Sequence, residues 1–301
     1  MNFQHTLKRS ASLTGIGLHS GQPATITLRP APPNNGIGFV RSDLSDCPQI
    51  LAHYKNIVNT QLATTLGQGK IIFSTVEHLM AALQGMGVDN AVVEVSGPEV
   101  PIMDGSSAPF VRVIQEAGLQ SQLQVQPYVV LRRKVELKIA EKWAVAEPSN
   151  HLEIQASIDW DHPAIGYQEF NYVHGKSDFS EIAASRTWGM LRDVESLRSM
   201  GFAQGGSLDN AVVLDEGRVL NSEGLRYPDE FVRHKVLDAL GDFKLAGVSI
   251  HAHFRLHRSG HDLHSQLLAA IFRDPENYGL IDPAAREDRP AARIRAALAG
   301  A

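Results

Sequence analysis

The chain has 301 residues, a formal net charge of -5 at neutral pH and an ordinary apolar content of 43%. Its charged residues are scattered, so no basic stripe indicates a nucleic-acid partner, and no run approaches the roughly 20 apolar residues of a membrane span. The N-terminal segment lacks the apolar core of a signal peptide, so we expect a cytoplasmic protein with at most a peripheral membrane contact. Cys47 is the only cysteine, which excludes an intramolecular disulfide and a cysteine-based zinc cluster.

Residues 6–30 contain two strand-like runs around the sequence TGIGLHSG at residues 14–21. The two glycines of TGIG could also begin a dinucleotide-binding fingerprint, which requires a strand, a turn and then a helix. The residues that follow include Pro23 and the β-branched run at 25–27, which predict a strand. We therefore interpret the glycines as part of a hairpin.

Two later parts of the chain share one order of elements: a helix, a glycine, an apolar strand and a second helix. The first part covers residues 74–85, 90–95 and 108–116, and the second covers residues 229–245, 248–256 and 263–272. This order predicts a weak internal duplication of a βααβ-like unit.

A polar stretch at residues 122–127 separates the two parts, so we expect one domain over residues 1–126 and another over residues 127–301. Further short strands are predicted at residues 134–139, 152–158, 167–173 and 211–214. The fold class is therefore expected to be α+β. The charged residues between 286 and 295 indicate a solvated tail or a terminal helix.

The helix predicted to begin at Asp229, a suitable N-cap, carries His234 and Asp238 one turn apart. Asp242 follows on the same face, and the apolar stripe occupies a different face, formed by Val232, Val236, Leu237, Leu240 and Phe243. A His and an Asp at this spacing can bind one metal ion. The alternative is a solvated face on which Lys235 and Asp238 form a helical ion pair worth about 0.2–0.5 kcal/mol. The spacing alone favours the alternative.

The helix predicted from Ser74 places His78 opposite its apolar stripe, beside Ala82 and Gly85. Such small neighbours would let another layer approach His78, as a ligand shared with a distant helix requires. Glu77 has a competing interpretation, because Ser74-x-x-Glu77 is a capping box in which the carboxylate accepts a backbone N–H. The sequence alone favours the capping box.

Histidines are dense near the end of the last predicted strand. Alternation places His251, His253 and His257 on one strand face, while His261 follows on a loop, where a histidine can act as an acid or an anion partner at neutral pH. His264 lies close by, and by count any of these five histidines could be a metal ligand, although a surface position is the commoner explanation for most of them.

Six segments occur in the order in which they occur in the UDP-3-O-acyl-N-acetylglucosamine deacetylases, and the chain resembles this family from about Thr6 to Asp274. The segments are TGIGLHSG at 14–21, STVEHLMAAL at 74–83, IDWDHPAI at 158–165, SRTWG at 185–189, RHKVLDALGD at 233–242 and SGH at 259–261. The resemblance implies two βααβ-type sandwich domains, each with a small insertion, with the active site between them. It also implies a monomeric zinc enzyme of the committed step of lipid A biosynthesis, which hydrolyses the acetamide of an acylated UDP-N-acetylglucosamine to acetate and the free amine.

By this resemblance one zinc ion is held by His78, His234 and Asp238, which leaves a fourth position for water, as in catalytic zinc sites. Glu77 would take a proton from that water, whose pKa bound zinc lowers toward about 7. The remaining catalytic roles are likewise implied by the family: Thr187 would stabilise the oxyanion, a contribution of typically about 2.7–4 kcal/mol, His261 would serve the leaving amine or the developing charge, and Asp242 would keep His261 cationic and oriented.

The family also implies substrate contacts. Lys235 is expected near the sugar, Arg258 near the diphosphate and Trp160 against the uridine, with His19 and Trp188 as further contacts. The family usually has phenylalanine at the position of Trp188, and a methionine and a cysteine at the positions of Gln61 and Ala63, so we expect a pocket of different shape.

Residues 190–213 match the family insertion that admits the acyl chain. Apolar lining would come from Leu191, Val194, Leu197, Met200 and Phe202. An amphipathic helix packed on its own core explains the same residues equally well.

Two other functions stay open from the sequence. One is a non-enzymatic nucleotide-sugar binder, if Trp188 and the loop at Gln61 close the site. The other is a different metallohydrolase, although peptide substrates are not expected because the H-E-x-x-H motif of zinc peptidases is absent.

Overall fold

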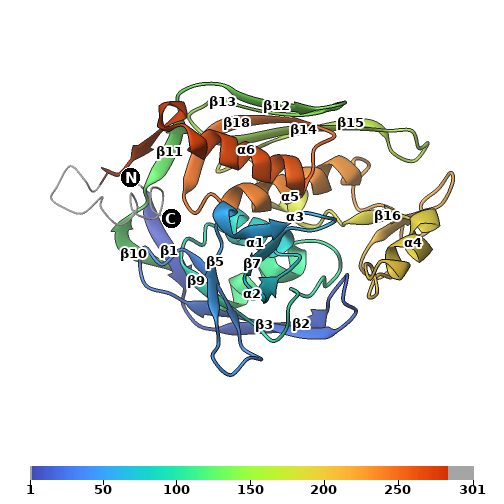
Figure 1. Cartoon of the computed structure of the whole chain (residues 1–301), viewed down its shortest axis with the longest axis horizontal. Coiled ribbons are helices and arrows are strands. Elements are labelled where there is room, and N and C mark those ends of the chain that lie inside the picture. Colours follow the sequence, from blue (N-terminus) through green and yellow to red (C-terminus); the bar gives the residue numbers. More distant parts are fainter. Residues whose placement is uncertain (1, 284–301) are drawn as a thin grey trace.

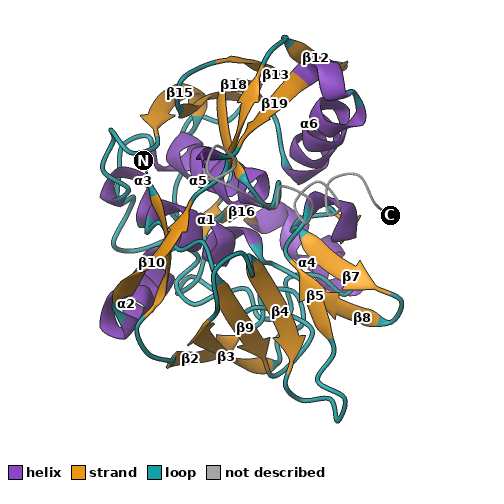
Figure 2. Cartoon of the chain, turned by 90° about the vertical axis from the view of Figure 1, so that its left-hand side faces the viewer, coloured by secondary structure: helices purple, strands orange, loops and turns teal. Residues whose placement is uncertain are grey.

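Two sheets form the outer layers of the protein, and the principal helices lie between them (Figures 1 and 2). The computed structural model describes residues 2–283. Strand β3 (Pro23–Pro30) buries Ala24, Ile26 and Leu28 and turns the residues between them outward. Alternation of this kind gives each sheet one apolar face, which packs against the helices, and one polar face.

The first sheet belongs to the N-terminal part of the chain. Its strands lie in the order β2 (Ala11–Ile16), β3, β9 (Ala91–Val95), β4 (Ile37–Arg41) and β5 (Gln49–Leu51). β4 and β9 are parallel, whereas the other neighbours are antiparallel. Helix α1 (Glu77–Gly85) precedes β9, and helix α2 (Ala108–Ala117) follows it. The six residues between β2 and β3 make the predicted hairpin, and no helix follows TGIG, so the dinucleotide-binding interpretation is excluded.

The second sheet repeats this arrangement. Its strands pair in the order β12 (Val135–Ile139), β13 (Lys142–Pro148), β18 (Ser249–His257), β14 (Leu152–Trp160) and β15 (Gly166–Val173), with β14 parallel to β18. Helix α5 (Glu230–Lys244) precedes β18, and helix α6 (His261–Arg273) follows it. Both units therefore run four strands, a helix, a strand and a helix. This common order is what a duplicated unit would give, and the duplication itself remains a prediction.

The other elements extend the two units. β6 (Ile57–Asn59), β7 (Thr65–Gln68) and β8 (Ile71–Phe73) form a small sheet inserted between β5 and α1. α3 (Ser180–Ala183), β16 (Trp188–Met190), α4 (Val194–Ser199) and β17 (Val212–Leu214) are inserted between β15 and α5. β1 (Phe3–Leu7) pairs with β10 (Leu119–Val125), and β11 (Tyr128–Leu131) joins the second sheet between β18 and β19 (Tyr278–Ile281). Short 3-10 helices cover Tyr54–Asn56, Leu191–Asp193 and Pro275–Asn277. The α+β class is confirmed.

The expected division at residues 126 and 127 falls between β10 and β11, and it remains a proposal. The tail predicted at residues 286–295 and the end of the second proposed domain lie outside the described residues. Within residues 2–283, no helix combines the length and apolar character needed to cross a bilayer.

Helices α1 and α5 contact each other where the two units meet. A Cβ atom at Gly241 of α5 would overlap the backbone carbonyl group of Glu77 in α1. Glycine therefore allows the two helix backbones to approach closely at this point. The approach brings the histidine-bearing faces of α1 and α5 together.

Candidate active site

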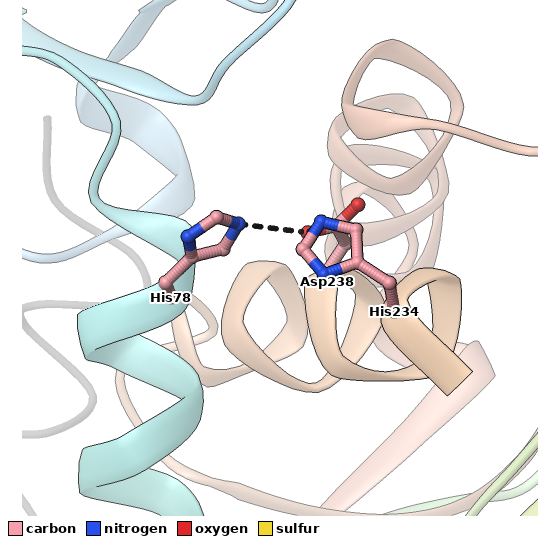
Figure 3. Close-up of side chains that lie close together, drawn as sticks. All are labelled: His78, His234 and Asp238. Atoms are coloured by element: carbon pink, nitrogen blue, oxygen red, sulfur yellow. Dashed lines mark ion pairs between the residues drawn. The ribbon is translucent and has the colours of Figure 1, made fainter. Parts of the chain in front are cut away.

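His78 of α1 and His234 of α5 point toward one carboxylate, that of Asp238 (Figure 3). Asp238 Oδ1 lies 3.4 Å from His78 Nε2 and 3.3 Å from His234 Nε2, and none of the three side chains is more than 5% exposed. Their ligand atoms all lie within 4.8 Å of one another. Two imidazole nitrogens and one carboxylate oxygen are a donor set that suits zinc.

The hydrogen bonds around these three side chains leave Asp238 Oδ1 and His234 Nε2 free to bind a metal ion. Asp238 Oδ2 accepts from Lys235 Nζ at 2.8 Å, whereas Asp238 Oδ1 is buried and has no hydrogen-bond partner among the described residues. His234 Nδ1 lies 3.1 Å from the carbonyl oxygen of Ser185, which leaves Nε2 to face the cluster. A buried carboxylate oxygen without a donor is costly unless a cation meets it. These three residues therefore fit a bound metal ion.

The alternative of a solvated helix face is wrong for α5. The Lys235–Asp238 ion pair exists, but His234, Asp238 and Asp242 are each only 2% exposed. Both the apolar stripe and the polar face of α5 are therefore buried, because α5 packs against its own sheet on one side and against α1 on the other. Asp229 stands at the predicted N-cap position, but its carboxylate accepts from Arg233 Nε at 2.6 Å and makes no capping hydrogen bond.

Glu77 does not form the expected capping box. The hydroxyl of Ser74 lies 3.0 Å from Thr65 Oγ1, and Glu77 Oε2 accepts from the backbone N–H of Thr64 at 3.0 Å. The capping-box interpretation is therefore wrong. Burial raises the pKa of the Glu77 carboxyl, and the nearby His261 opposes this shift without cancelling it. A carboxylate with a raised pKa is suited to accept a proton near neutral pH.

His261 lies between two carboxylates at the start of α6. Its Nε2 is 3.9 Å from Glu77 Oε1, and its Nδ1 is 2.8 Å from Asp242 Oδ2. Burial lowers the pKa of His261, but Asp242 and Glu77 outweigh it and raise the pKa to about 9. The pKa of Asp242 is held well below its usual value, although burial alone would raise it, because His261 and His264 stabilise the carboxylate. His261 is therefore cationic at neutral pH and can donate a proton.

A single cavity collects these groups. Its lining consists of Leu18, Leu62, Thr75, Glu77, His78, Thr187, Trp188, His234, Lys235, Asp238 and His261. Thr187 is fixed from both sides, since its N–H donates to the carbonyl oxygen of Gly105 and its own carbonyl oxygen accepts from the N–H of Val212, both at 2.8 Å. Asp242 lies behind His261. The cavity thus unites a metal-type donor set, a buried carboxylate, a cationic imidazole and a hydroxyl.

Three predicted substrate contacts do not line this cavity. Arg258 lies 3.4 Å from Asp159 through Nη2 and Oδ2. Trp160 is 42% exposed, and its ring packs edge-on against Trp188 with 4.8 Å between centroids. His19 packs edge-on against Phe202 at 5.3 Å. Trp160 is therefore connected to the cavity through Trp188, and His19 adjoins the lining residue Leu18.

The two departures from the family pattern at Gln61 and Ala63 flank Leu62, which lines the cavity. In the second insertion, no residue of α4 is buried, and Leu191 and Met200 are 46% and 55% exposed. Val194 and Leu197 of α4 are half-buried and its other residues are exposed, so both the passage and the amphipathic helix remain open as predictions.

Two residues of the network were not expected from the sequence. Thr64 Oγ1 donates to Asp242 Oδ1 at 2.6 Å, and His264 Nδ1 lies 2.8 Å from Asp242 Oδ2. Thr64 sits in a loop without a recognisable pattern. His264 could have been predicted from its position three residues after His261, because residues three apart on a helix lie on the same face.

Comparison with known proteins shows to which protein family the chain is related. A family model described as UDP-3-O-acyl N-acetylglycosamine deacetylase matches residues 4–273. A UDP-3-O-acyl-N-acetylglucosamine deacetylase of Myxococcus xanthus is 50% identical over 285 residues, which cover 94% of this chain and 91% of the relative. The proteins of the same name from Geobacter sp. and Haemophilus influenzae (strain 86-028NP) are 47% and 43% identical, and these alignments cover 94% and 95% of this chain and 93% and 95% of the relatives.

Proposed function

Because the chain belongs to the family of UDP-3-O-acyl-N-acetylglucosamine deacetylases, we propose that it removes the acetyl group from an acylated, UDP-linked N-acetylglucosamine in the committed step of lipid A biosynthesis. The observation that carries the proposal is the meeting of His78 from the first unit with His234 and Asp238 from the second, beside Glu77 in one cavity. The reaction breaks the amide C–N bond and releases acetate and the free amine.

The metal in this proposal is one zinc ion per chain, held by His78, His234 and Asp238. Support comes from the donor set and from the buried Asp238 Oδ1, which lacks a hydrogen-bond donor among the described residues. When bound, zinc supplies Lewis acidity toward the acetamide carbonyl and lowers the pKa of a water molecule.

The protein side chains divide the proton transfers between them. Glu77, whose pKa burial raises, takes the proton of the attacking water. His261, cationic at neutral pH, donates a proton to the departing amine nitrogen, and Asp242 holds its ring from the other side. The hydroxyl of Thr187 donates to the oxyanion that forms on the carbonyl oxygen when water attacks the carbonyl carbon. These roles extend the family assignment to the positions of this chain.

The substrate contacts are also part of the proposal. Lys235 binds the sugar, Arg258 the diphosphate and Trp160 the uridine, while His19 and Trp188 border the sugar and acyl sites. The acyl chain enters past the second insertion, where Leu191 and Met200 present exposed apolar side chains. We further propose that residues 1–126 and 127–301 are the two domains and that the enzyme works as a cytoplasmic monomer.

The test combines two measurements on the purified protein: bound metal by elemental analysis, and acetate release from the acylated UDP-sugar before chelation, after chelation and after zinc is returned. Near-stoichiometric zinc with chelator-sensitive turnover is expected. Tight binding of the UDP-sugar without acetate release would instead identify a nucleotide-sugar binder and overturn the proposal.

Variants separate the individual roles. Glu77→Ala should retain zinc and lose turnover, whereas His78→Ala should lose both. His253→Ala is the matched control, because His253 does not line the cavity, and it should keep both. Unchanged turnover in Glu77→Ala would contradict the role of Glu77 as the base, but it would not contradict the assignment of the metal ligands.

A further inference from the structure

We propose that His264 is a positioning residue that fixes the carboxylate of Asp242 and, through it, the ring of His261. The inference rests on the proposed function, because it concerns how His261 is held for proton transfer. It is carried by a chain of hydrogen bonds that runs from Ser259 through His264 and Asp242 to His261.

Asp242 receives three donors, one from the loop before β7 and two from helix α6. Its Oδ1 accepts from the hydroxyl of Thr64 at 2.6 Å. Its Oδ2 lies 2.8 Å from His261 Nδ1 and 2.8 Å from His264 Nδ1. His261 and His264 therefore share one oxygen, Asp242 Oδ2. A substitution of His264 should consequently change the hydrogen bond between His261 and Asp242.

The direction of these hydrogen bonds follows from the charge of Asp242. An ionised carboxylate only accepts, so both histidines donate through Nδ1–H. The other ring nitrogen of His264, Nε2, lies 2.9 Å from the hydroxyl of Ser259, in the loop before α6. His264 thus has both ring nitrogens paired. A flipped ring would turn C–H groups toward Asp242 and Ser259 and leave their polar atoms unsatisfied, which is costly in a buried site.

Packing alone does not explain a histidine at this position. His264 is 0% exposed and lies beside the ring of Phe243, with 5.3 Å between centroids. An apolar side chain would fill such a site without the cost of burying a polar ring. Without His264, Asp242 would keep Thr64 on Oδ1 but only His261 on Oδ2, so the carboxylate could rotate and His261 could follow it.

Three substitutions of His264 dissect this role. The side-chain amide nitrogen of Asn can take the place of Nδ1, and that of Gln can take the place of Nε2. His264→Asn should therefore keep a donor to Asp242, His264→Gln should keep only the contact with Ser259, and His264→Leu should keep neither. We expect kcat to fall roughly 10- to 100-fold in the Leu and Gln variants, the range typical for residues that orient active-site groups, with KM and zinc content close to wild type. His264→Asn should retain most of kcat.

A double substitution distinguishes positioning from structural support. In a His261→Ala background, His264→Leu should lower kcat no further, because its effect passes through His261. Wild-type kcat in His264→Leu, equal losses in all three variants, or a further loss in the His261→Ala background would each overturn the inference while leaving the proposed function intact. If His264→Leu does not fold, the Asn and Gln variants decide between the outcomes. A wild-type protein that releases no acetate would overturn the proposed function and this inference with it.

Discussion

The hydroxyl of Thr64, in the first unit, donates to Oδ1 of Asp242, in the second, across 2.6 Å. The backbone N–H of the same threonine donates to Glu77 Oε2 at 3.0 Å. One residue therefore holds both the carboxylate proposed as the base and the carboxylate behind His261, and it does so across the junction between the two units.

Thr64→Val keeps the shape of the side chain and the backbone donor to Glu77 but removes the donor to Asp242. A hydrogen bond to a charged group contributes about 1.5–3 kcal/mol. If this loss falls on the transition state, kcat should drop roughly 10- to 100-fold, with little change in zinc content. Steady-state kinetics measure the effect. The adjacent Thr65→Val is the matched control, because Thr65 pairs with Ser74 and not with the site; an equal loss of kcat there would show that Thr64 has no special role.

Arg186 and Glu230 form a buried pair next to the site, with side-chain exposures of 2% and 0%. Arg186 Nε donates to Glu230 Oε1 at 2.8 Å, and the backbone N–H of Arg186 donates to the same oxygen at 3.0 Å. Arg186→Met should lower the free energy of unfolding by about 3–5 kcal/mol, because it leaves a buried carboxylate unpaired.

The double variant Arg186→Met/Glu230→Gln should recover a large part of this loss, since both charges are then removed while the amide oxygen of Gln can still accept the backbone N–H of Arg186. Urea denaturation of the two variants provides the comparison. A double variant less stable than Arg186→Met would contradict the assignment of the loss to an unpaired buried charge.

Gly241→Ala should force α1 and α5 apart. Alanine in a helix is favoured over glycine by about 0.8–1 kcal/mol, but the added methyl group would overlap the backbone of Glu77. Overpacking costs typically about 1–3 kcal/mol, and backbone cannot move aside as a side-chain end can. We therefore expect net destabilisation together with weaker zinc retention. Gly217→Ala, where an added Cβ meets nothing within 4 Å, should change neither the unfolding temperature nor the metal content.

Acid should begin to destabilise the fold below pH 6.5, because two half-buried histidines outside the site stay neutral in the folded chain. Burial lowers the pKa of His174 to about 4 and that of His53 to about 4. In the unfolded chain these histidines have a pKa of about 6.5, so below that pH the unfolded chain binds protons that the folded chain does not bind. The two histidines therefore do not lower the free energy of unfolding above about pH 6.5, and they lower it progressively as the pH falls toward about 4. Unfolding temperatures measured from pH 7 to pH 5 should decline less steeply in His174→Leu, and still less steeply when His53→Leu is added. An unchanged slope in the double variant would show that other groups govern this range.

Local patterns predicted the parts of the fold that local forces determine. The hairpin of β2 and β3, the helix–strand–helix runs of both units and strands such as β14 follow alternation or helical periodicity in the sequence. β13 was missed because it buries Ala144, Val145 and Ala146 in succession, which removes the alternation that marks a strand with one solvent face.

In the site, too, local patterns did not reveal contacts between distant segments. The spacing of His234 and Asp238 indicated a possible metal site, but it could not show that α5 is buried on both faces. That burial depends on the close approach of α1 at Gly241. The capping box at Ser74 was a sound local pattern that a distant partner displaced, because the N–H of Thr64 takes the carboxylate of Glu77. The roles of the site residues remain proposals, drawn from family resemblance and supported by the geometry.

His78 comes from the first unit, and His234 and Asp238 come from the second. Unfolding separates these donors, so an ion bound by all three is bound by the native chain and released on unfolding. By mass action each tenfold excess of free ion over its dissociation constant adds about 1.4 kcal/mol to the free energy of unfolding. Under the proposed assignment of zinc to this site, the resistance of the protein to heat depends on its metal supply, and loss of the ion should lower both its unfolding temperature and its turnover.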